Sequence, residues 1–280
     1  MREPGYALNE YIDRQTVQSD DIAAFPLTAL AATLDRTEAN DTVPPLWHWL
    51  YFLPVAPMSE VGRDGHPERG GFLPPVPLPR RMWAGGRLTF HAPLKLGDRA
   101  TRTSTIANIE DKTGRSGRLV FVTVKHAIEV EGELKLEEEH DIVYRDAPQE
   151  GGRQPQPAIA PEGETWRRTV DADAVLLFRY SALTFNGHRI HYDYPYATDV
   201  EGYPGLIVHG PLIATLLVDL VRREQPGATL QSFAFRALHP TFADQPFTVC
   251  GRPSADGKTI DLWAKDHEGY LTMRATAVLA

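Results

Sequence analysis

Apolar residues recur along the first half of the chain with two periods, which predict where strands and helices form. Apolar and polar residues alternate over 120–124, a pattern typical of a half-buried strand. By this criterion we expect strands at 87–91, 100–111, 117–130 and 134–145. Helices are expected before them over 20–34, with Asp20 as N-cap, and over 46–53. Residues 59–80 are rich in Gly and Pro and are expected to form a long loop.

The second half repeats this order of elements. A short strand around 167–170 precedes a helix over 171–184, and an irregular stretch over 185–206 follows. A second helix is expected from Pro211 to Arg223, because proline is tolerated in the first turn of a helix. Four strands are then expected at 229–237, 247–253, 259–264 and 271–278.

Short sequence matches point to an internal repeat. Thr16-Val17 recurs as Thr169-Val170, and Phe25 recurs as Phe178, in both cases 153 residues later. A third match joins Phe90-His91-Ala92 to Phe235-Arg236-Ala237 at an offset of 145 residues. Matches in the same order at similar offsets favour duplication over coincidence.

We therefore predict an α+β protein that contains one fold twice. The predicted units are an N-terminal domain over 1–146, a Pro/Gly-rich linker over 147–164 and a C-terminal domain over 165–280. An antiparallel sheet wrapped around a long central helix is the plan of a hot-dog domain, so the prediction is a tandem (double) hot-dog fold. Two such sheets placed edge to edge lose exposed edges. A single large β-sandwich with added helices explains the recurring helices less well.

Composition narrows the class of protein. The 280 residues are 42% hydrophobic and 24% charged, which excludes a wholly disordered or fibrous chain. No apolar run reaches the ~18 residues that a membrane span needs, and the start lacks the apolar core of a signal peptide. Cys250 is the single cysteine, so no intrachain disulfide forms, and we expect a cytoplasmic protein. The net charge of −8, without a basic block, argues against a nucleic-acid partner.

The densest polar cluster lies on irregular chain between two expected helices, over residues 186–193. Three interpretations compete. His188, His191 and Asp193 are ligand types that a divalent metal accepts. Alternatively, the side chains hold the loop together by hydrogen bonds. In the third interpretation one histidine, paired with a polar residue before it, performs acid–base chemistry near neutral pH.

The segment that follows favours the acid–base interpretation. Gly205 to Leu212 leads directly into the second helix of this half, and a helix start offers free N–H groups and a positive dipole end. Gly210 allows a substrate oxygen to approach the backbone closely. Such a site stabilises the oxyanion that forms when a thioester becomes an enolate. Gly210 alone is better explained by tight packing against a sheet, but its combination with the His191 cluster indicates function.

Longer motifs then identify a family resemblance. Asn186-x4-His191-x-Asp193 followed by Val208-His209-Gly210-Pro211 resembles the MaoC-like, R-specific enoyl-thioester hydratases and dehydratases. Within them the chain resembles the double-hot-dog branch of type 2 hydroxyacyl-thioester dehydratases and mesaconyl-C4-CoA hydratases. The matching signatures span almost the whole chain and lie at 62–66, 72–86, 188–193 and 235–240.

The resemblance implies an acyl-CoA substrate and assigns the catalytic roles to His191, Asn186 and Gly210. Most relatives have Asp where this chain has Asn186, which cannot act as a base. We therefore expect Asn186 to hold a water molecule and orient His191, which transfers the proton nearly alone. At the 153-residue offset, Asn186 falls on Thr33 and His191 on Glu38. We therefore expect one active site per chain, in the C-terminal half, with the N-terminal half shaping the acyl pocket.

Other residues are expected to bind the substrate. Arginine binds carboxylates by a two-pronged contact, so Arg80 and Arg81 beside Trp83 favour a small dicarboxylic acyl group. These arginines could equally bind CoA phosphates or face solvent. Among candidate substrates, itaconyl-CoA and mesaconyl-C4-CoA both give citramalyl-CoA on hydration. The remaining substrate-binding candidates are His209, Tyr192 and Arg236.

Two alternative functions stay open at this point. One is a 3-hydroxyacyl-thioester dehydratase of fatty-acid metabolism, and the other is a non-catalytic acyl-CoA binding protein. We expect no metal and no redox cofactor, because the thioester itself takes up electrons and coenzyme A is part of the substrate. A homodimer is common among the families that the chain resembles.

Overall fold

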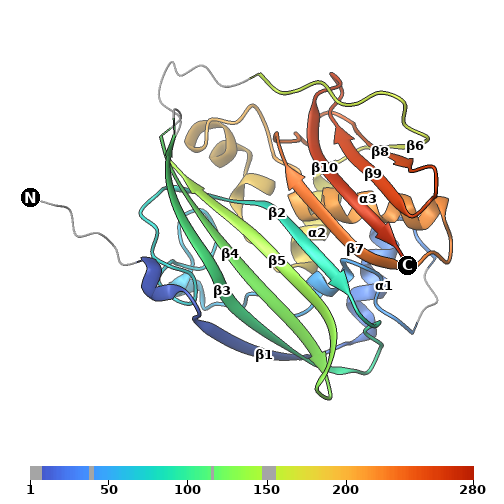
Figure 1. The fold of residues 1–280 in the computed structure, drawn as a ribbon. Helices are drawn as coiled ribbons and strands as arrows, with labels where there is room; N and C mark the ends of the chain where they lie inside the picture. The colour runs from blue at the N-terminus through green and yellow to red at the C-terminus, as the bar shows by residue number, and fades with distance from the viewer. Residues whose placement is uncertain (1–7, 38–40, 115–116, 147–155) are drawn as a thin grey trace, which may run out of the picture.

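One antiparallel sheet runs through the whole molecule (Figure 1). The computed structural model describes residues 8–37, 41–114, 117–146 and 156–280. In these ranges the sheet has ten strands in the order β1-β3-β4-β5-β2-β7-β10-β9-β8-β6. The strands are β1 (Gln15–Asp21), β2 (Arg80–Phe90), β3 (Arg99–Gly114), β4 (Gly117–Val130), β5 (Glu133–Arg145), β6 (Trp166–Val170), β7 (Leu230–Ala237), β8 (Phe247–Pro253), β9 (Thr259–Lys265) and β10 (Leu271–Leu279).

The strand order shows the repeat. Read outward from the centre, the first half runs β2-β5-β4-β3-β1 and the second runs β7-β10-β9-β8-β6. Each half thus places its strands in the same chain order around the shared centre. The α+β class and the tandem hot-dog fold are confirmed. The domain boundaries stay a prediction, and residues 147–155 of the predicted linker lie outside the described residues.

The two halves join where β2 pairs with β7. Gly85 to Thr89 pair antiparallel with Ser232 to Arg236, which is the edge-to-edge arrangement expected from the sequence. A Cβ atom on Gly85 would lie 2.5 Å from the Phe235 carbonyl oxygen. A Cβ atom on Gly86 would lie 2.9 Å from the Phe235 ring. Glycine is therefore required at this seam because the backbone and an aromatic ring approach too closely for any side chain.

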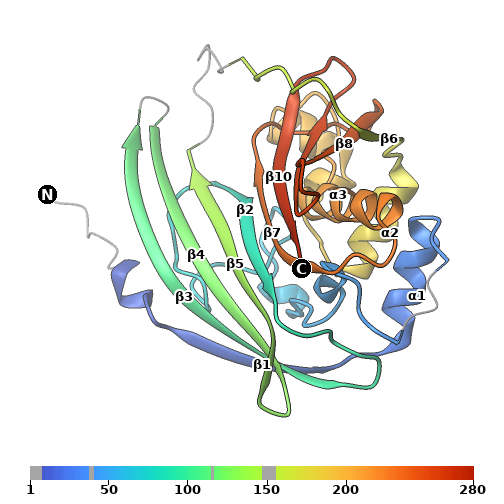
Figure 2. The same cartoon turned by 45° about the vertical axis from the view of Figure 1, so that its right-hand side comes forward.

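Three α-helices lie on one side of the sheet (Figures 1 and 2). They are α1 (Ala24–Thr33), α2 (Ala174–Leu183) and α3 (Gly210–Glu224). Shorter helical turns are Leu8–Tyr11, Trp47–Leu50, Met58–Glu60, Arg189–His191 and Tyr196–Val200. Every residue from Leu212 to Val221 is buried, because α3 packs against β6, β8, β9 and β10. Among the described residues, no helix has both the length and the apolar character to span a bilayer.

The first half has a loop where the second has its central helix. Only one helical turn, Trp47–Leu50, forms in the segment expected to be a helix over 46–53. Val76 and Leu78 instead pack against the inner face of β3, β4 and β5. The Arg69 guanidinium holds this loop by donating to the carbonyls of Val76 (2.8 Å) and Pro79 (2.8 Å). The expectation of a long central helix in both halves is therefore wrong for the first half.

Other local predictions also need correction. Asp20 lies in β1, where its carboxylate accepts from the Phe52 N–H (2.7 Å), and α1 begins only at Ala24. Strand β2 begins at Arg80, seven residues earlier than predicted. Strand β5 also contains a buried carboxylate. Glu138 is 4% exposed and accepts from the Trp49 indole N–H (3.1 Å), beside His48.

A buried carboxylate connects α3 to its surroundings. Asp219 is fully buried and meets Arg223 on α3 at 2.6 Å and Arg168 on β6 at 3.2 Å. Arg36, after α1, lies 3.5 Å from the other carboxylate oxygen. These contacts link three elements that are distant in the sequence.

We predict that Asp219→Ala destabilises the protein by about 3–5 kcal/mol, because it leaves arginines next to a buried position without their common partner. Urea unfolding with an unchanged m-value measures the loss. The control is Asp261→Ala, which removes an exposed carboxylate 3.7 Å from Arg252 and should change stability little. Equal effects of the two substitutions would contradict the prediction.

Candidate active site

His191 is a buried imidazole with one nitrogen already engaged. It ends the helical turn Arg189–His191, and its Nδ1 lies 2.6 Å from the Ile207 carbonyl oxygen. A carbonyl only accepts, so Nδ1 is the nitrogen with the proton and Nε2 is left as an acceptor. Burial lowers the pKa of His191 to about 4, although the Ile207 carbonyl opposes this shift. The ring is therefore neutral near pH 7, as a general base must be.

The ring of His209 packs against the ring of His191. It is fully buried, and its ring stacks on the His191 ring with centroids 3.7 Å apart and planes 19° from parallel. Its Nε2 lies 2.8 Å from the Ser181 hydroxyl on α2. Burial, together with the charges that His191 and His188 would have if protonated, keeps the pKa of His209 well below its usual value. His209 thus packs as a neutral ring that fixes the plane of His191.

The N-terminus of α3 begins directly after His209. Gly210 is its first residue, and a Cβ atom there would meet nothing within 4 Å. Open space therefore lies beside the backbone at this point, and Gly210 is not explained by tight packing. The first N–H groups of a helix have no partner within the helix, and the dipole places partial positive charge there. An oxyanion next to His191 can be bound at this position.

Asn186 organises the loop before His191. Its side-chain Oδ1 accepts from the His188 backbone N–H (3.0 Å), and its own N–H donates to the Ser181 carbonyl (2.8 Å). The contact that orients the His191 ring is the Ile207 carbonyl. A role of Asn186 in holding water stays a prediction.

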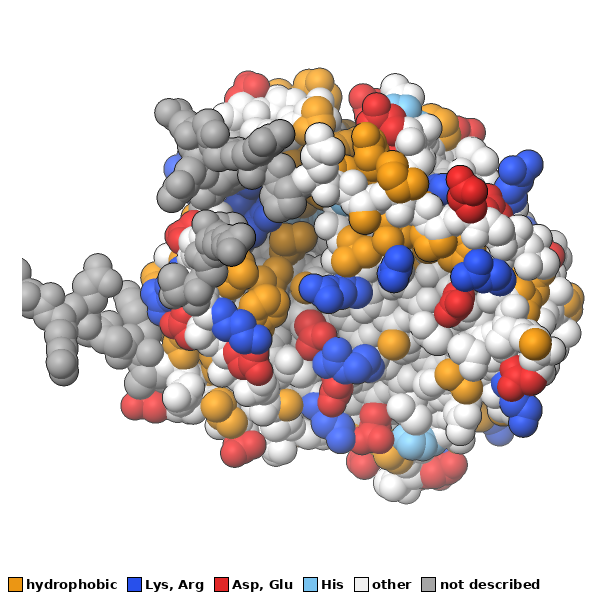
Figure 3. Space-filling view, turned by 45° about the horizontal axis from the view of Figure 1, so that its top comes forward, with side chains coloured by type: hydrophobic (Ala, Val, Ile, Leu, Met, Phe, Trp, Pro, Cys, Tyr) orange, Lys and Arg blue, Asp and Glu red, His pale blue; other side chains and the backbone are white. Residues whose placement is uncertain are grey.

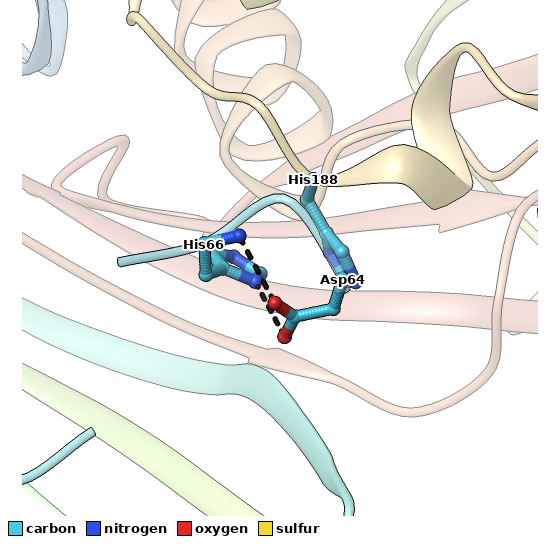
Figure 4. Close-up of side chains that lie close together, drawn as sticks. All are labelled: Asp64, His66 and His188. Carbon is cyan, nitrogen blue, oxygen red and sulfur yellow. Dashed lines mark hydrogen bonds and ion pairs between the residues drawn. The ribbon is translucent and has the colours of Figure 1, made fainter. Parts of the chain in front are cut away.

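A second group of titratable side chains lies next to His191 and includes two residues from the first half of the chain. Asp64 and His66 lie on one loop and meet His188 from the other half, as Figure 4 shows. The Asp64 carboxylate accepts from the His66 backbone N–H (3.0 Å) and lies 3.1 Å from His66 Nδ1. The His66 and His188 rings have centroids 4.1 Å apart, and the His188 ring stands edge-on to His191 at 5.4 Å. The site therefore contains groups from both halves.

Two glycines allow the loops to meet. A Cβ atom on Gly65 would lie 1.8 Å from the Gly187 carbonyl oxygen, and one on Gly187 would lie 2.7 Å from the Gly65 carbonyl oxygen. The Arg189 N–H also donates to the Asp64 carbonyl (2.9 Å). Backbone contacts thus fix the Asp64–His66 loop against the His191 loop.

The side chains of Asp64, His66 and His188 differ in charge. Burial lowers the pKa of His188 to about 2, so its ring is neutral. Burial alone would raise the pKa of Asp64, but the His66 hydrogen bonds, the charge that His66 would have if protonated, and the Arg81 charge hold it well below its usual range. The pKa of His66 is lowered by burial against the opposing effect of Asp64. The group thus combines one carboxylate with neutral imidazoles.

Arg81 and Trp83 face the same interior. They pair with Tyr144 and Ile142 of β5, whose side chains are buried. The Arg81 charge acts on Asp64, His66 and His188, which places this guanidinium beside the site. The Trp83 ring packs on His140 with centroids 3.8 Å apart. These placements agree with a role of Arg81 and Trp83 in the substrate pocket.

The remaining substrate-binding candidates lie elsewhere. The Arg80 guanidinium forms an ion pair with Glu201 (3.1 Å). Arg236 is exposed, on the opposite face of β7 from the buried Phe235. Tyr192 is 53% exposed, and its hydroxyl donates to the Gly187 carbonyl (3.1 Å). Nothing in these contacts directs the three side chains toward His191.

The structure also bears on the metal interpretation of the polar cluster. Asp193 accepts from Arg189 (2.7 Å) and from the Tyr196 N–H (3.1 Å), so its carboxylate is already engaged. This disfavours His188, His191 and Asp193 as a ligand set. Within the described part of the chain, the group with ligand atoms close enough for one cation is Asp64, His66 and His188, all within 4.8 Å of one another.

Residues 62–66 are part of a family signature, but their sequence alone assigns no chemistry to Asp64 or His66. The available signal was the Asp64-x-His66 spacing between glycines. Its partner His188 lies 122 residues further on, and no local pattern joins the two.

Fold and site together define a class of enzyme. A buried imidazole with a free Nε2 beside the open N-terminus of a hot-dog helix is suited to moving a proton and stabilising an enolate, as acyl-thioester chemistry requires. Residues 46–243 match the model of the hydroxyacyl-thioester dehydratase type 2 family, and the chain belongs to this family. It is therefore a hydro-lyase of the hydratase and dehydratase kind.

Individual relatives agree with this assignment. The chain is 48% identical over 276 residues to mesaconyl-C(4)-CoA hydratase of Chloroflexus aurantiacus, with 96% of each chain covered. Among solved structures, HtdX of Mycobacterium tuberculosis has a TM-score of 0.70 at 16% identity, covering 94% of this chain and 98% of its own. A MaoC-like dehydratase from Phytophthora capsici has a TM-score of 0.69 at 14% identity, covering 99% of both chains. The two solved structures support the fold.

We predict that the buried histidines make the fold acid-sensitive. Burial lowers the pKa of His191 to about 4 and that of His140 to about 4. An unfolded histidine has a pKa of ~6.5, so the unfolded chain takes up more protons below that pH, and stability falls from about pH 6.5 down to about pH 4. Urea unfolding across this range measures the slope. His140→Gln should flatten it and the exposed control His267→Gln should not; equal slopes would contradict the prediction.

Proposed function

We propose that this protein hydrates a short, branched dicarboxylic enoyl-CoA, mesaconyl-C4-CoA or itaconyl-CoA, to give citramalyl-CoA. The observation that supports this most is the free His191 Nε2 next to the open N-terminus of α3. The nearby charge of Arg81 supports a dicarboxylic acyl group. The name of the 48% identical relative, a mesaconyl-C(4)-CoA hydratase, agrees with it. We propose the cytoplasm as the location.

The proposed reaction uses the site residues in turn. The thioester carbonyl oxygen lies at the N–H groups of Gly210 and the first turn of α3. His191 Nε2 takes a proton from water as the water oxygen bonds to the β-carbon. The electrons of the C=C bond move onto the thioester oxygen, giving an enolate. The His191 imidazolium then returns the proton to the α-carbon, so one water is added and no further cofactor is needed.

We propose Arg81 as the group that recognises the distal carboxylate. Of the two neighbouring arginines predicted to bind the substrate, Arg81 faces the interior, whereas Arg80 is paired with Glu201. A guanidinium binds a carboxylate through two parallel hydrogen bonds, a geometry that lysine does not offer. Trp83, packed on His140 and edge-on to Trp49 at 4.9 Å, provides an apolar wall for the carbon chain.

The net charge of −8 does not oppose binding of CoA. On the face shown in Figure 3, acidic and basic side chains are interspersed, and hydrophobic side chains lie next to Lys and Arg. Local basic groups on such a surface can meet the CoA phosphates despite the overall charge.

The family description favours a second candidate function, dehydration of a 3-hydroxyacyl thioester. It uses the same groups in reverse, with His191 removing the α-proton and returning it to the leaving hydroxyl. Because one enzyme catalyses both directions of the reaction, the two functions are separated by the acyl group, through kcat/KM for crotonyl-CoA against kcat/KM for the dicarboxylic enoyl-CoAs.

We expect turnover with mesaconyl-C4-CoA or itaconyl-CoA, measured by mass spectrometry, and faster hydration of these than of crotonyl-CoA. His191→Ala should lower kcat by a factor of order 100 or more, because the base is lost. The exposed variant His267→Ala is the matched control and should keep full activity. No turnover of any enoyl-CoA by the wild-type protein would leave only a binding function.

We predict that Arg81→Met lowers kcat/KM for the dicarboxylic substrate by roughly 10- to 100-fold, because a charge-assisted contact contributes ~1.5–3 kcal/mol. The value for crotonyl-CoA, which has no second carboxylate, should change little. The control is Arg236→Met, an exposed arginine of the neighbouring strand. An equal loss for both substrates would show that Arg81 acts on the site in general and not on the carboxylate.

A further inference from the structure

At the position of Asn186 most relatives have an Asp that helps to activate water, and this chain has no carboxylate there. The structure places another carboxylate, that of Asp64, close to the histidines of the site. Asp64 comes from the opposite half of the chain, yet its negative charge acts on both His66 and His188. Asp193, the carboxylate nearest in sequence to His191, is engaged by Arg189 instead. The carboxylate available to the histidine group is thus Asp64.

We propose that Asp64 and His66 form a carboxylate–imidazole pair that positions the water molecule from which His191 takes a proton. This inference rests on the proposed hydration and adds a second group to it. His66 holds the second hydrogen of the water through Nε2 while His191 removes the first. Asp64 holds the His66 Nδ1 proton and balances the positive charge that forms on His191.

The geometry supports this arrangement. Asp64 faces His66 Nδ1 at 3.1 Å, so Nδ1 donates and Nε2 is free to accept. The same carboxylate accepts the His66 backbone N–H, which fixes the pair as one unit. His66 and His191 both contact the ring of His188, at centroid distances of 4.1 and 5.4 Å, so the three imidazoles form one cluster. A carboxylate–imidazole pair of this kind orients the ring and stabilises its charged form.

The proton balance is simple. Water forms its bond to the β-carbon, and the π bond of the enoyl group breaks toward the thioester oxygen. One water proton goes to His191 Nε2 and then to the α-carbon. The other stays on the new hydroxyl, hydrogen-bonded to His66. No oxidant, reductant or metal is needed.

A divalent cation on Asp64, His66 and His188 is the competing arrangement. The structure favours the carboxylate–imidazole pair, because both carboxylate oxygens of Asp64 already accept from His66. A cation would need at least one of them. Metal content therefore belongs among the outcomes of the test.

The test uses the full-length protein with the substrate that the wild-type chain turns over. Asp64→Asn keeps an acceptor for the His66 N–H but removes the charge, and we expect kcat to fall roughly 10- to 100-fold with little change in KM. His66→Gln should have a similar effect and serves if Asp64→Asn does not fold. The exposed controls Asp261→Asn and His267→Gln should leave kcat unchanged.

Two further readouts separate a chemical role from a structural one. Removing the Asp64 charge should lower the pKa of the catalytic base and move the acid limb of the kcat/KM profile to lower pH. The charged groups facing His66 are Asp64, Arg81 and Arg69, with His188 in ring contact, and only Asp64 is changed. The double variant Asp64→Asn/Asn186→Asp restores a carboxylate at the neighbouring position and should recover part of the lost rate.

Several results would overturn the proposal. The first is a wild-type kcat and pH profile in Asp64→Asn. The second is a rate loss that follows a lowered Tm and is not recovered by Asn186→Asp. The third is a stoichiometric zinc or manganese ion in the purified protein, lost with activity on chelation, which would replace the carboxylate–imidazole pair with a metal site. Absence of wild-type turnover on any enoyl-CoA would instead overturn the proposed function itself.

Discussion

The pairing of β2 with β7 is the constraint on which the rest of the molecule depends. It makes one sheet from two repeats, and it fixes β2, the strand that contains Arg81 and Trp83, next to the second half of the sheet. The loop that precedes β2 is thereby directed toward the His191 loop, where Gly65 and Gly187 let the two backbones touch. A site that uses groups from both halves follows from this seam.

Burial gives the site its chemical character. His188, His191 and His209 would each hold a proton more readily in water, and the interior keeps them neutral. A neutral imidazole with its Nδ1 engaged by a carbonyl has a single free acceptor, which is what a base requires. The same burial makes folding sensitive to acid. The lowered pKa values that keep the histidines neutral therefore also reduce the stability of the fold at low pH.

Elements and site residues could be predicted from the sequence where the signal lies within a short segment of the chain. Strands β4 and β8 begin and end at the predicted residues, because their alternating patterns are flanked by turns. His191 and Gly210 lie 19 residues apart in adjoining segments, so their common site was visible as a motif. The position of Pro211 in the first turn of α3 is likewise a short-range feature.

Features that depend on distant partners could not be predicted in this way. Glu138 resembles a solvated charge until His48 and Trp49, some 90 residues away, are seen to surround it. Arg80 and Arg81 are neighbours of the same type, yet only the register of β2 against β5 decides that Arg81 faces inward. Asp64 and His66 are recognised as part of the site only when the fold places His188 next to them.

Nuclear magnetic resonance of the protein with ¹⁵N-labelled imidazoles tests the central claim most directly, because it reports which nitrogen of His191 has the proton. Our account predicts a neutral ring with the proton on Nδ1 and an unprotonated Nε2, unchanged as the pH falls from about 8 to about 5. A His191 that is doubly protonated near pH 7, or that has its proton on Nε2, would contradict the account.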